Sequence, residues 1–426
     1  MNAIVAISLE LRLACLFALG VLAGAAINLA VYSLAWHPRP ISPWSPPAKG
    51  LAARRWADRL PLVGWWLLRR EASRHGSGFW VRPIVVELAS GALFVLVYLS
   101  DVEWSRAVVV PGAAPPAVGF LAADLPLVLH ARFAAHVVLI SLMLVASLID
   151  FDEKTIPDAI TVWGTLLGLA IATAYPWSLL PAGDWLIGAQ RHVEFLTLTS
   201  PEPWPEILGG APALVSLAVA LGCWTLWCGG LLPRRWNMRR GFSTAVRVLC
   251  HRLLAERISY RIALMWAVGV VAIFVAHRGL PEAHWAGLLS ALAGAAAGGG
   301  IVWIVRNVGT AALAREAMGF GDVTLMSMIG TFIGWQGAIV VFFLAPFFGL
   351  ILGVAERLSS GEHEIPYGPF LCLATLLVII EWPTIWLEAE PIFAMGWLLP
   401  AVLAGAMVLL GVMLLAYRRI VERVAR

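Results

Sequence analysis

Long apolar segments recur along the chain and are separated by shorter polar ones. Each is long enough to cross a bilayer as a helix, which needs about 20 mostly apolar residues. We predict membrane helices at 11–35, 83–100, 131–149, 159–178, 211–233, 260–279, 283–305, 337–357, 366–385 and 396–417. A shorter segment, 322–335, begins with an aspartate and is expected to start inside the protein, shielded from lipid. The pattern predicts an all-α polytopic membrane protein of about eleven helices.

The composition supports a membrane protein. Hydrophobic residues make up 60% of the chain and charged residues 13%, compared with about 25% charged residues in soluble domains. The five cysteines form no C-x-x-C pair, so we expect neither a disulfide framework nor a zinc site. The first apolar segment follows Glu10 and Arg12 instead of a basic leader, so we interpret it as a retained membrane helix.

The positive charges indicate the orientation of the chain. Of the 30 Lys and Arg residues, 25 lie in the segments 36–82, 150–158, 234–261, 306–321 and 356–365 or in the tail after residue 417. Because positive residues stay in the cytoplasm, the N-terminus is predicted outside and the C-terminus in the cytoplasm. The basic loops are then explained by topology and by contact with membrane lipid, and no nucleic-acid partner is expected.

Two aspartates interrupt the apolar pattern at predicted cytoplasmic helix ends. Asp150 ends one helix within "SLIDFDEKTIPD", and Asp322 begins another after Gly319 and Gly321 in "MGFGD". Carboxylates in membrane helices are costly and are usually functional. The glycines permit backbone conformations that would bring Asp322 close to a second carboxylate. Such a pair suits general acid–base chemistry on a peptide bond, but it equally suits a proton relay in a transporter.

Six segments, in order along the chain, resemble bacterial prepilin peptidases, the type IV leader peptidases, which are G-x-G-D membrane aspartic proteases. They are GVLAGAAINLAVYSL, RLPLVGWWLLRR, VRPIVVELASGALF, SLIDFDEKTIPD, EAMGFGDVTLMSMIGTFIGWQGA and IPYGPFLCLA. The resemblance implies that Asp150 and Asp322 are catalytic and that Gly319 and Gly321 shape the active-site loop. The implied reaction is cleavage of the short basic leader of prepilins or pseudopilins at the cytoplasmic face of the bacterial inner membrane.

Many members of the family then N-methylate the new N-terminus with S-adenosylmethionine, and the resemblance raises this activity for the present chain. Arg82 and Glu87 are candidates to support this activity, and the simpler interpretation is that they form an interfacial ion pair. Many members carry cysteine pairs for zinc in the first cytoplasmic loop, whereas this loop has none. We therefore expect the loop to fold without metal and proteolysis to need no cofactor, and the methyltransferase activity is left open.

The two aspartates lie 172 positions apart, which is farther than the resemblance leads us to expect. We interpret the surplus as an inserted cassette with two extra helices and a basic loop. The expected division is 1–100 (first two helices and loop), 101–178 (first aspartate motif), 179–282 (cassette), 283–385 (G-x-G-D helices) and 386–426 (additional helix and tail).

Acidic residues near the two motifs are expected to meet the basic leader of the substrate. They are Asp152, Glu153, Glu316, Glu362 and Glu364. One alternative to the peptidase is the transporter or proton relay described above, and another is a non-catalytic family member that acts as an assembly scaffold.

Overall fold

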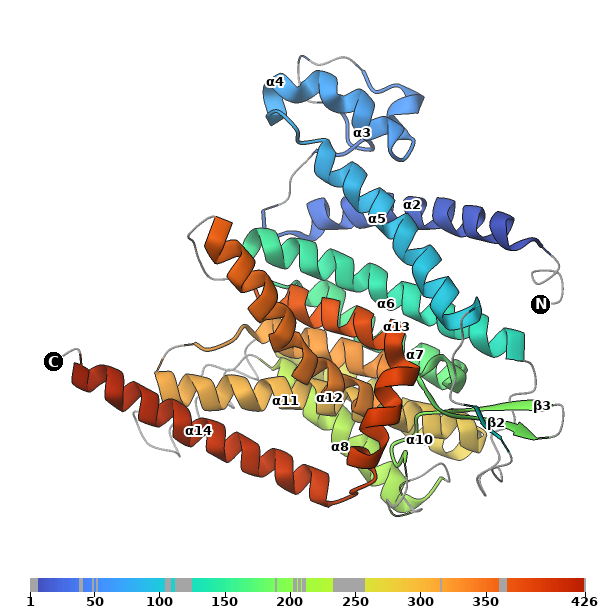
Figure 1. The fold of residues 1–426 in the computed structure, drawn as a ribbon, viewed down its shortest axis with the longest axis vertical. Coiled ribbons are helices and arrows are strands. Elements are labelled where there is room, and N and C mark those ends of the chain that lie inside the picture. The colour runs from blue at the N-terminus through green and yellow to red at the C-terminus, as the bar shows by residue number, and fades with distance from the viewer. Residues whose placement is uncertain are drawn as a thin grey trace.

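The computed structural model shows a bundle of long helices with one small unit beside it (Figure 1). It describes residues 7–424 except 38–40, 48–49, 51–52, 104–108, 112–124, 188–189, 202–204, 206–207, 209–211, 233–256, 315 and 360–365. The long helices are α2 (Leu9–Leu34), α5 (Val81–Tyr98), α6 (Leu125–Glu153), α7 (Asp158–Ala174), α8 (Leu214–Leu231), α10 (Arg257–Gly279), α11 (Glu282–Leu313), α12 (Phe320–Ser359), α13 (Gly368–Phe393) and α14 (Leu398–Val424).

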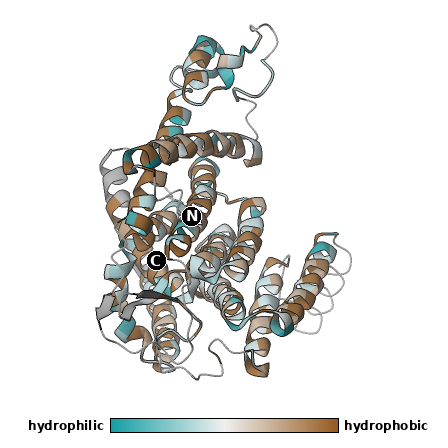
Figure 2. Cartoon of the chain, turned by 90° about the vertical axis from the view of Figure 1, so that its right-hand side faces the viewer, coloured by the Kyte–Doolittle hydropathy of each residue, from teal (hydrophilic) through white to brown (hydrophobic). Residues whose placement is uncertain are grey.

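Nine helices among the described residues are long and apolar enough to cross a membrane, judged by length and composition. The tenth long element, α7, is apolar but shorter. Most of the helical ribbon has the colours of apolar residues in Figure 2, and only 6% of the apolar window of α14 is buried. These features confirm a mostly helical, polytopic membrane protein.

Helix α12 folds back on itself at Gly334. This residue has φ 76° and ψ 173°, which interrupts the helix. A Cβ atom built on Gly298 of α11 would lie 2.5 Å from the carbonyl oxygen of Met326 and 3.3 Å from Cβ of Ala338. In a straight helix Met326 and Ala338, which are twelve positions apart, would be separated by about 18 Å along the axis. The two arms of α12 therefore both pack against α11, and the first arm coincides with the short helix predicted at 322–335.

A small β-sheet lies near the start of α6 and departs from the all-α prediction. Strands β1 (Val109–Pro111) and β2 (Pro181–Ile187) pair in parallel, and β2 pairs antiparallel with β3 (Gln190–Phe195). The indole N–H groups of Trp382 and Trp386, on α13, donate to the carbonyl oxygens of Pro181 and Ala182 at 2.7 and 2.8 Å. These bonds attach the sheet to the bundle.

The chain between α2 and α5 forms a small unit at the top of Figure 1, with short helices α3 (Val63–Leu68) and α4 (Ala72–His75). Two ion pairs hold it together: Arg54 with Glu71, and Arg70 with Asp58. Glu71 and Asp58 are almost fully buried, so their charges need these partners. Within the described residues, this unit is held by ion pairs and apolar packing.

Candidate active site

Asp150 lies in the last turn of α6, and its side chain is buried. The helix ends just beyond it because Lys154 adopts a positive φ of 54°, and the Lys154 N–H donates to the carbonyl oxygen of Asp150 at 2.8 Å. A left-handed residue is a common way to end a helix, although glycine usually occupies that position. The local backbone therefore fixes where α6 stops and places Asp150 at its end.

Asp322 lies in the first turn of α12 and is also buried. The N–H of Gly319 donates to its carboxylate. A Cβ atom on Gly321 would lie 2.8 Å from Cβ of Ile156, closer than real Cβ atoms approach. Only glycine therefore allows the start of α12 to pack against the segment that joins α6 to α7. The two glycines singled out in the sequence thus lie at the aspartate and at this packing contact.

The structure brings Asp150 and Asp322 together although 172 positions separate them. The two carboxylates are close enough to interact electrostatically. The N–H of Gly368, at the start of α13, donates to Asp150, and a Cβ atom there would lie 2.6 Å from Asp150 Oδ2. The site is therefore formed where the end of α6 meets the starts of α12 and α13.

Two further residues near the carboxylates come from the start of α13 and from the position just before it. Tyr367 interacts electrostatically with Asp322. A tyrosine hydroxyl is a hydrogen-bond donor, so Tyr367 is able to donate next to this carboxylate. Cys372, one turn into α13, is fully enclosed and interacts with both aspartates. The sequence analysis noted IPYGPFLCLA as a family-like segment but did not assign Tyr367, Gly368 or Cys372 to the site.

Arg82 and Glu87 do not pair with each other, so the ion-pair interpretation is wrong. Arg82, at the start of α5, bonds Asp152 at 2.7 and 2.8 Å. Glu87 is fully buried and accepts hydrogen bonds from the N–H of Leu62 and the indole of Trp65.

The side-chain amide of Asn28, on α2, also donates to Glu87 at 3.3 Å. Glu87 therefore ties the small unit to helices α2 and α5. A role for either residue in methylation stays a prediction.

Three of the five acidic residues expected to meet a basic leader lie among the described residues, and each of these has a partner within the chain. Asp152 is bonded to Arg82, and Glu316 is paired with Arg306. The carboxylate of Glu153 accepts from the backbone N–H groups of Trp36 and His37 at 2.6 and 3.0 Å. Glu362 and Glu364 lie outside the described residues. In the described residues these carboxylates connect segments of the protein itself.

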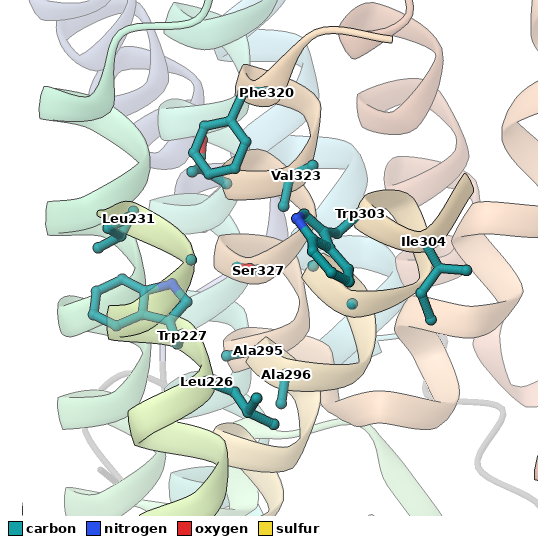
Figure 3. A pocket seen from close by; sticks show the side chains of 14 residues that line it. Leu226, Trp227, Leu231, Ala295, Ala296, Trp303, Ile304, Phe320, Val323 and Ser327 are labelled. Atoms are coloured by element: carbon teal, nitrogen blue, oxygen red, sulfur yellow. The ribbon is translucent and has the colours of Figure 1, made fainter. Parts of the chain in front are cut away.

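A separate apolar pocket of about 280 Å³ lies between α8, α11 and the first arm of α12. Figure 3 shows Trp227 and Trp303 on either side of it and Phe320 at one end. Phe320 and Ser327 share the face of α12 that lines this pocket. At about 100° per residue, Asp322 points roughly 150° away from that face. The pocket is therefore on the opposite side of α12 from the two carboxylates.

Among the residues that the structure describes, no group of three or more His, Cys, Asp and Glu side chains is arranged to hold a metal ion. The groups that the described residues place at this site are two buried carboxylates, two backbone N–H donors, a phenol and a thiol.

The type IV leader peptidase family model matches residues 137–232 and 252–354. These ranges include both aspartates, and also α8 and α10, which the sequence analysis assigned to the cassette. The cassette boundaries stay a prediction. The interval between the two matched ranges lies in the basic loop, outside the described residues.

Several curated proteins named prepilin leader peptidase/N-methyltransferase are similar to this chain. The one from Pseudomonas aeruginosa is 30% identical over 210 residues, which cover 48% of this chain and 67% of that protein. The one from Stutzerimonas stutzeri is 29% identical over 209 residues, with the same coverage. The one from Aeromonas salmonicida is 30% identical over 110 residues, which cover 22% of this chain and 38% of that protein.

No solved structure matches the chain. The match to both aspartate motifs, and the 30% identity across two thirds of the Pseudomonas aeruginosa protein, show that this chain belongs to the type IV leader peptidase family.

Proposed function

We propose that this protein is a membrane aspartic endopeptidase that removes the short basic leader of type IV prepilins or pseudopilins. The observation that carries the proposal is the meeting of buried Asp150 and Asp322 where three helix ends converge. Family membership favours this function over a transporter or a scaffold, because the family model covers both aspartate motifs and the relatives that are similar over about half of this chain are named prepilin leader peptidase/N-methyltransferase.

The two carboxylates would divide the roles of acid and base. One carboxylate holds a proton and polarises the carbonyl of the scissile peptide bond, while the other takes a proton from water, which attacks the carbonyl carbon. The resulting tetrahedral intermediate breaks its C–N bond, and a proton passes to the leaving nitrogen. The N–H groups of Gly319 and Gly368 orient the carboxylates, and the Tyr367 hydroxyl supplies a donor next to Asp322.

The proposed topology places this chemistry at the cytoplasmic face of the bacterial inner membrane. We infer about eleven membrane segments, counting both arms of α12, with the N-terminus outside and the C-terminus in the cytoplasm. The distribution of basic residues supports this orientation. The leader of the substrate would then reach the carboxylates from the cytoplasm, with its apolar segment among the helices.

N-methylation of the new N-terminus with S-adenosylmethionine is proposed as a second step. Its support is the second half of the relatives' name. Neither Arg82 nor Glu87 is needed for this proposal, since both have partners in the fold.

Substitution of either aspartate should abolish cleavage. Because the two carboxylates act as a unit, Asp150→Asn and Asp322→Asn should each lower turnover by at least about 10³-fold. The purified protein in detergent is given a prepilin-like peptide, with and without S-adenosylmethionine, and the product's N-terminus is read by mass spectrometry. An added methyl group in the presence of S-adenosylmethionine would identify the second step.

Asp158→Asn is the matched control, because Asp158 begins α7 near the same end of the bundle and has no contact with either carboxylate among the described interactions. It should cleave like the wild type. Full activity of Asp150→Asn or Asp322→Asn would contradict the dyad. Intact substrate with folded wild-type protein would contradict the peptidase function.

A further inference from the structure

We propose that Arg82 is a positioning residue for Asp150, an inference that rests on the proposed function. Its guanidinium group bonds to α6 on both sides of the aspartate. One nitrogen contacts the carboxylate of Asp152, two residues after Asp150, at 2.7 and 2.8 Å. The other donates to the carbonyl oxygen of Leu148, two residues before it, at 3.2 Å. Asp150 thus lies in a turn that is clamped from outside its own helix.

The end of α6 needs such a clamp because no further helical turn follows the one that carries Asp150. Terminal turns open more easily than helix centres. Glu153, in the same turn, provides a second tie by accepting the backbone N–H groups of Trp36 and His37. The position of Asp150 is therefore set by residues of the first cytoplasmic segment as well as by α6.

Arg82 itself stands on a firmly held part of the backbone. The next residue, Pro83, lies in the first turn of α5, where its ring fixes φ. The side-chain amide of Asn28 donates to the Pro83 carbonyl oxygen at 3.0 Å and to buried Glu87 at 3.3 Å. The start of α5 is thus anchored to α2, and Arg82 connects this anchored segment to the turn that carries Asp150.

The chemistry of the contact requires arginine. A guanidinium group is planar and presents several donors in a fixed fork, so it is able to bond Asp152 and the Leu148 carbonyl at once. Lysine would reach one of these partners as a point charge. The Arg82 side chain is 37% exposed and that of Asp152 17%, and ion pairs this exposed add little to overall stability. The main consequence of the contact is therefore local orientation.

The test compares Arg82→Gln and Arg82→Lys with Arg70→Gln in the leader-cleavage assay without S-adenosylmethionine. Arg70 is an arginine of similar exposure, 33%, but its partner Asp58 is fully buried, so Arg70→Gln reports what loosening the small unit alone does. Displacement of a catalytic group by about 1 Å costs on the order of 10²-fold. We expect Arg82→Gln to lower kcat about 10–100-fold, with KM changed less than about threefold, and Arg82→Lys to recover part of kcat.

The pH dependence of kcat distinguishes a positioning role from a merely structural one, because a merely structural role would leave the pH profile unchanged. Loosening the turn changes the surroundings of Asp150, so the limbs of the kcat profile should shift in Arg82→Gln and keep their wild-type positions in Arg70→Gln. A double-mutant cycle with Asp152→Asn should be non-additive, with the double variant no worse than the poorer single variant. If Arg82→Gln does not fold, Arg82→Lys and Asp152→Asn carry the same test.

The inference is overturned if the Arg82 and Asp152 variants keep wild-type kcat and pH profile, or if Arg70→Gln changes both to the same extent. These results are distinct from failure of the proposed function, which would appear as cleavage by Asp150→Asn. An inactive Asp150→Asn variant beside a wild-type-like Arg82→Gln variant would reject the positioning role alone.

Discussion

The chemistry of single residues explains why this chain keeps several charges in buried positions. Asp58 shows the principle in the small unit between α2 and α5, outside the long apolar helices. Burial by itself raises the pKa of Asp58, but the hydrogen bonds from Arg70 and from the Arg55 N–H, with the nearby Arg54 charge, lower that pKa overall. The folded unit therefore stabilises the ionised form of Asp58 more than the unfolded chain does.

This pKa shift predicts that acid loosens the small unit between α2 and α5. Because the folded pKa lies below the ordinary value of 3.8, the stability that Asp58 contributes is fully present above that value. It is lost as the pH falls through the folded pKa. Hydrogen exchange of peptides covering residues 55–75, referenced to an unstructured peptide at each pH, should show protection that Asp58→Asn lowers at neutral pH.

The difference between wild type and Asp58→Asn should shrink toward zero in acid. Glu422→Gln serves as the control, because Glu422 forms an exposed pair with Arg418 within α14 and should leave this protection unchanged. A difference that stays constant down to the lowest pH would show that the charge of Asp58 does not hold the unit together.

At the scale of elements, glycines determine how closely α11 and α12 approach. A Cβ atom on Gly294 would lie 2.0 Å from the carbonyl oxygen of Gly330, a backbone atom that has little freedom to move. The first arm of α12, which begins with Asp322, is held in place by this contact. Helix packing at small residues is a common arrangement in membranes, because it lets two backbones come close together.

Gly294→Ala should therefore destabilise the protein, while Gly300→Ala on the same helix should not. Overpacking costs about 1–3 kcal/mol. At Gly300 a Cβ atom would meet nothing within 4 Å, and alanine is favoured over glycine in a helix by up to about 1 kcal/mol. Thermal unfolding in detergent should give a lower Tm for Gly294→Ala and an equal or higher Tm for Gly300→Ala. Equal Tm values for the two variants would refute the close contact.

The elements themselves were largely predictable, because long apolar segments have few ways to satisfy their backbone in lipid. Helices such as α2 and α13 begin within about two residues of their predicted starts. The β-sheet was missed because its strands are only three to seven residues long and come from two connecting segments, where a search for long apolar segments finds nothing. The break in α12 at Gly334 lies next to the boundary between the two predicted segments 322–335 and 337–357, whereas the packing of both arms against α11 was not predicted.

The positive-inside rule predicts the orientation of the whole molecule, and this prediction is directly measurable. In a cysteine-free background, Ser73→Cys in the small unit between α2 and α5 and Glu282→Cys at the start of α11 place thiols at exposed positions that are predicted on opposite sides. A membrane-impermeant maleimide added to intact spheroplasts should label Glu282→Cys alone, and lysis should make Ser73→Cys reactive. The reverse pattern would place the carboxylates outside and exclude cleavage at the cytoplasmic face.

The sequence by itself determined that the chain belongs in lipid and that it is helical. It also singled out Asp150 and Asp322 and the family resemblance. These are local properties, since hydropathy, charge and short motifs are written in consecutive residues. The tertiary structure decided that the two aspartates meet, that Gly368 and Tyr367 join them, and that Arg82 contacts the Asp150 turn instead of Glu87. Such contacts join residues tens to hundreds of positions apart, and their geometry depends on how all the helices pack.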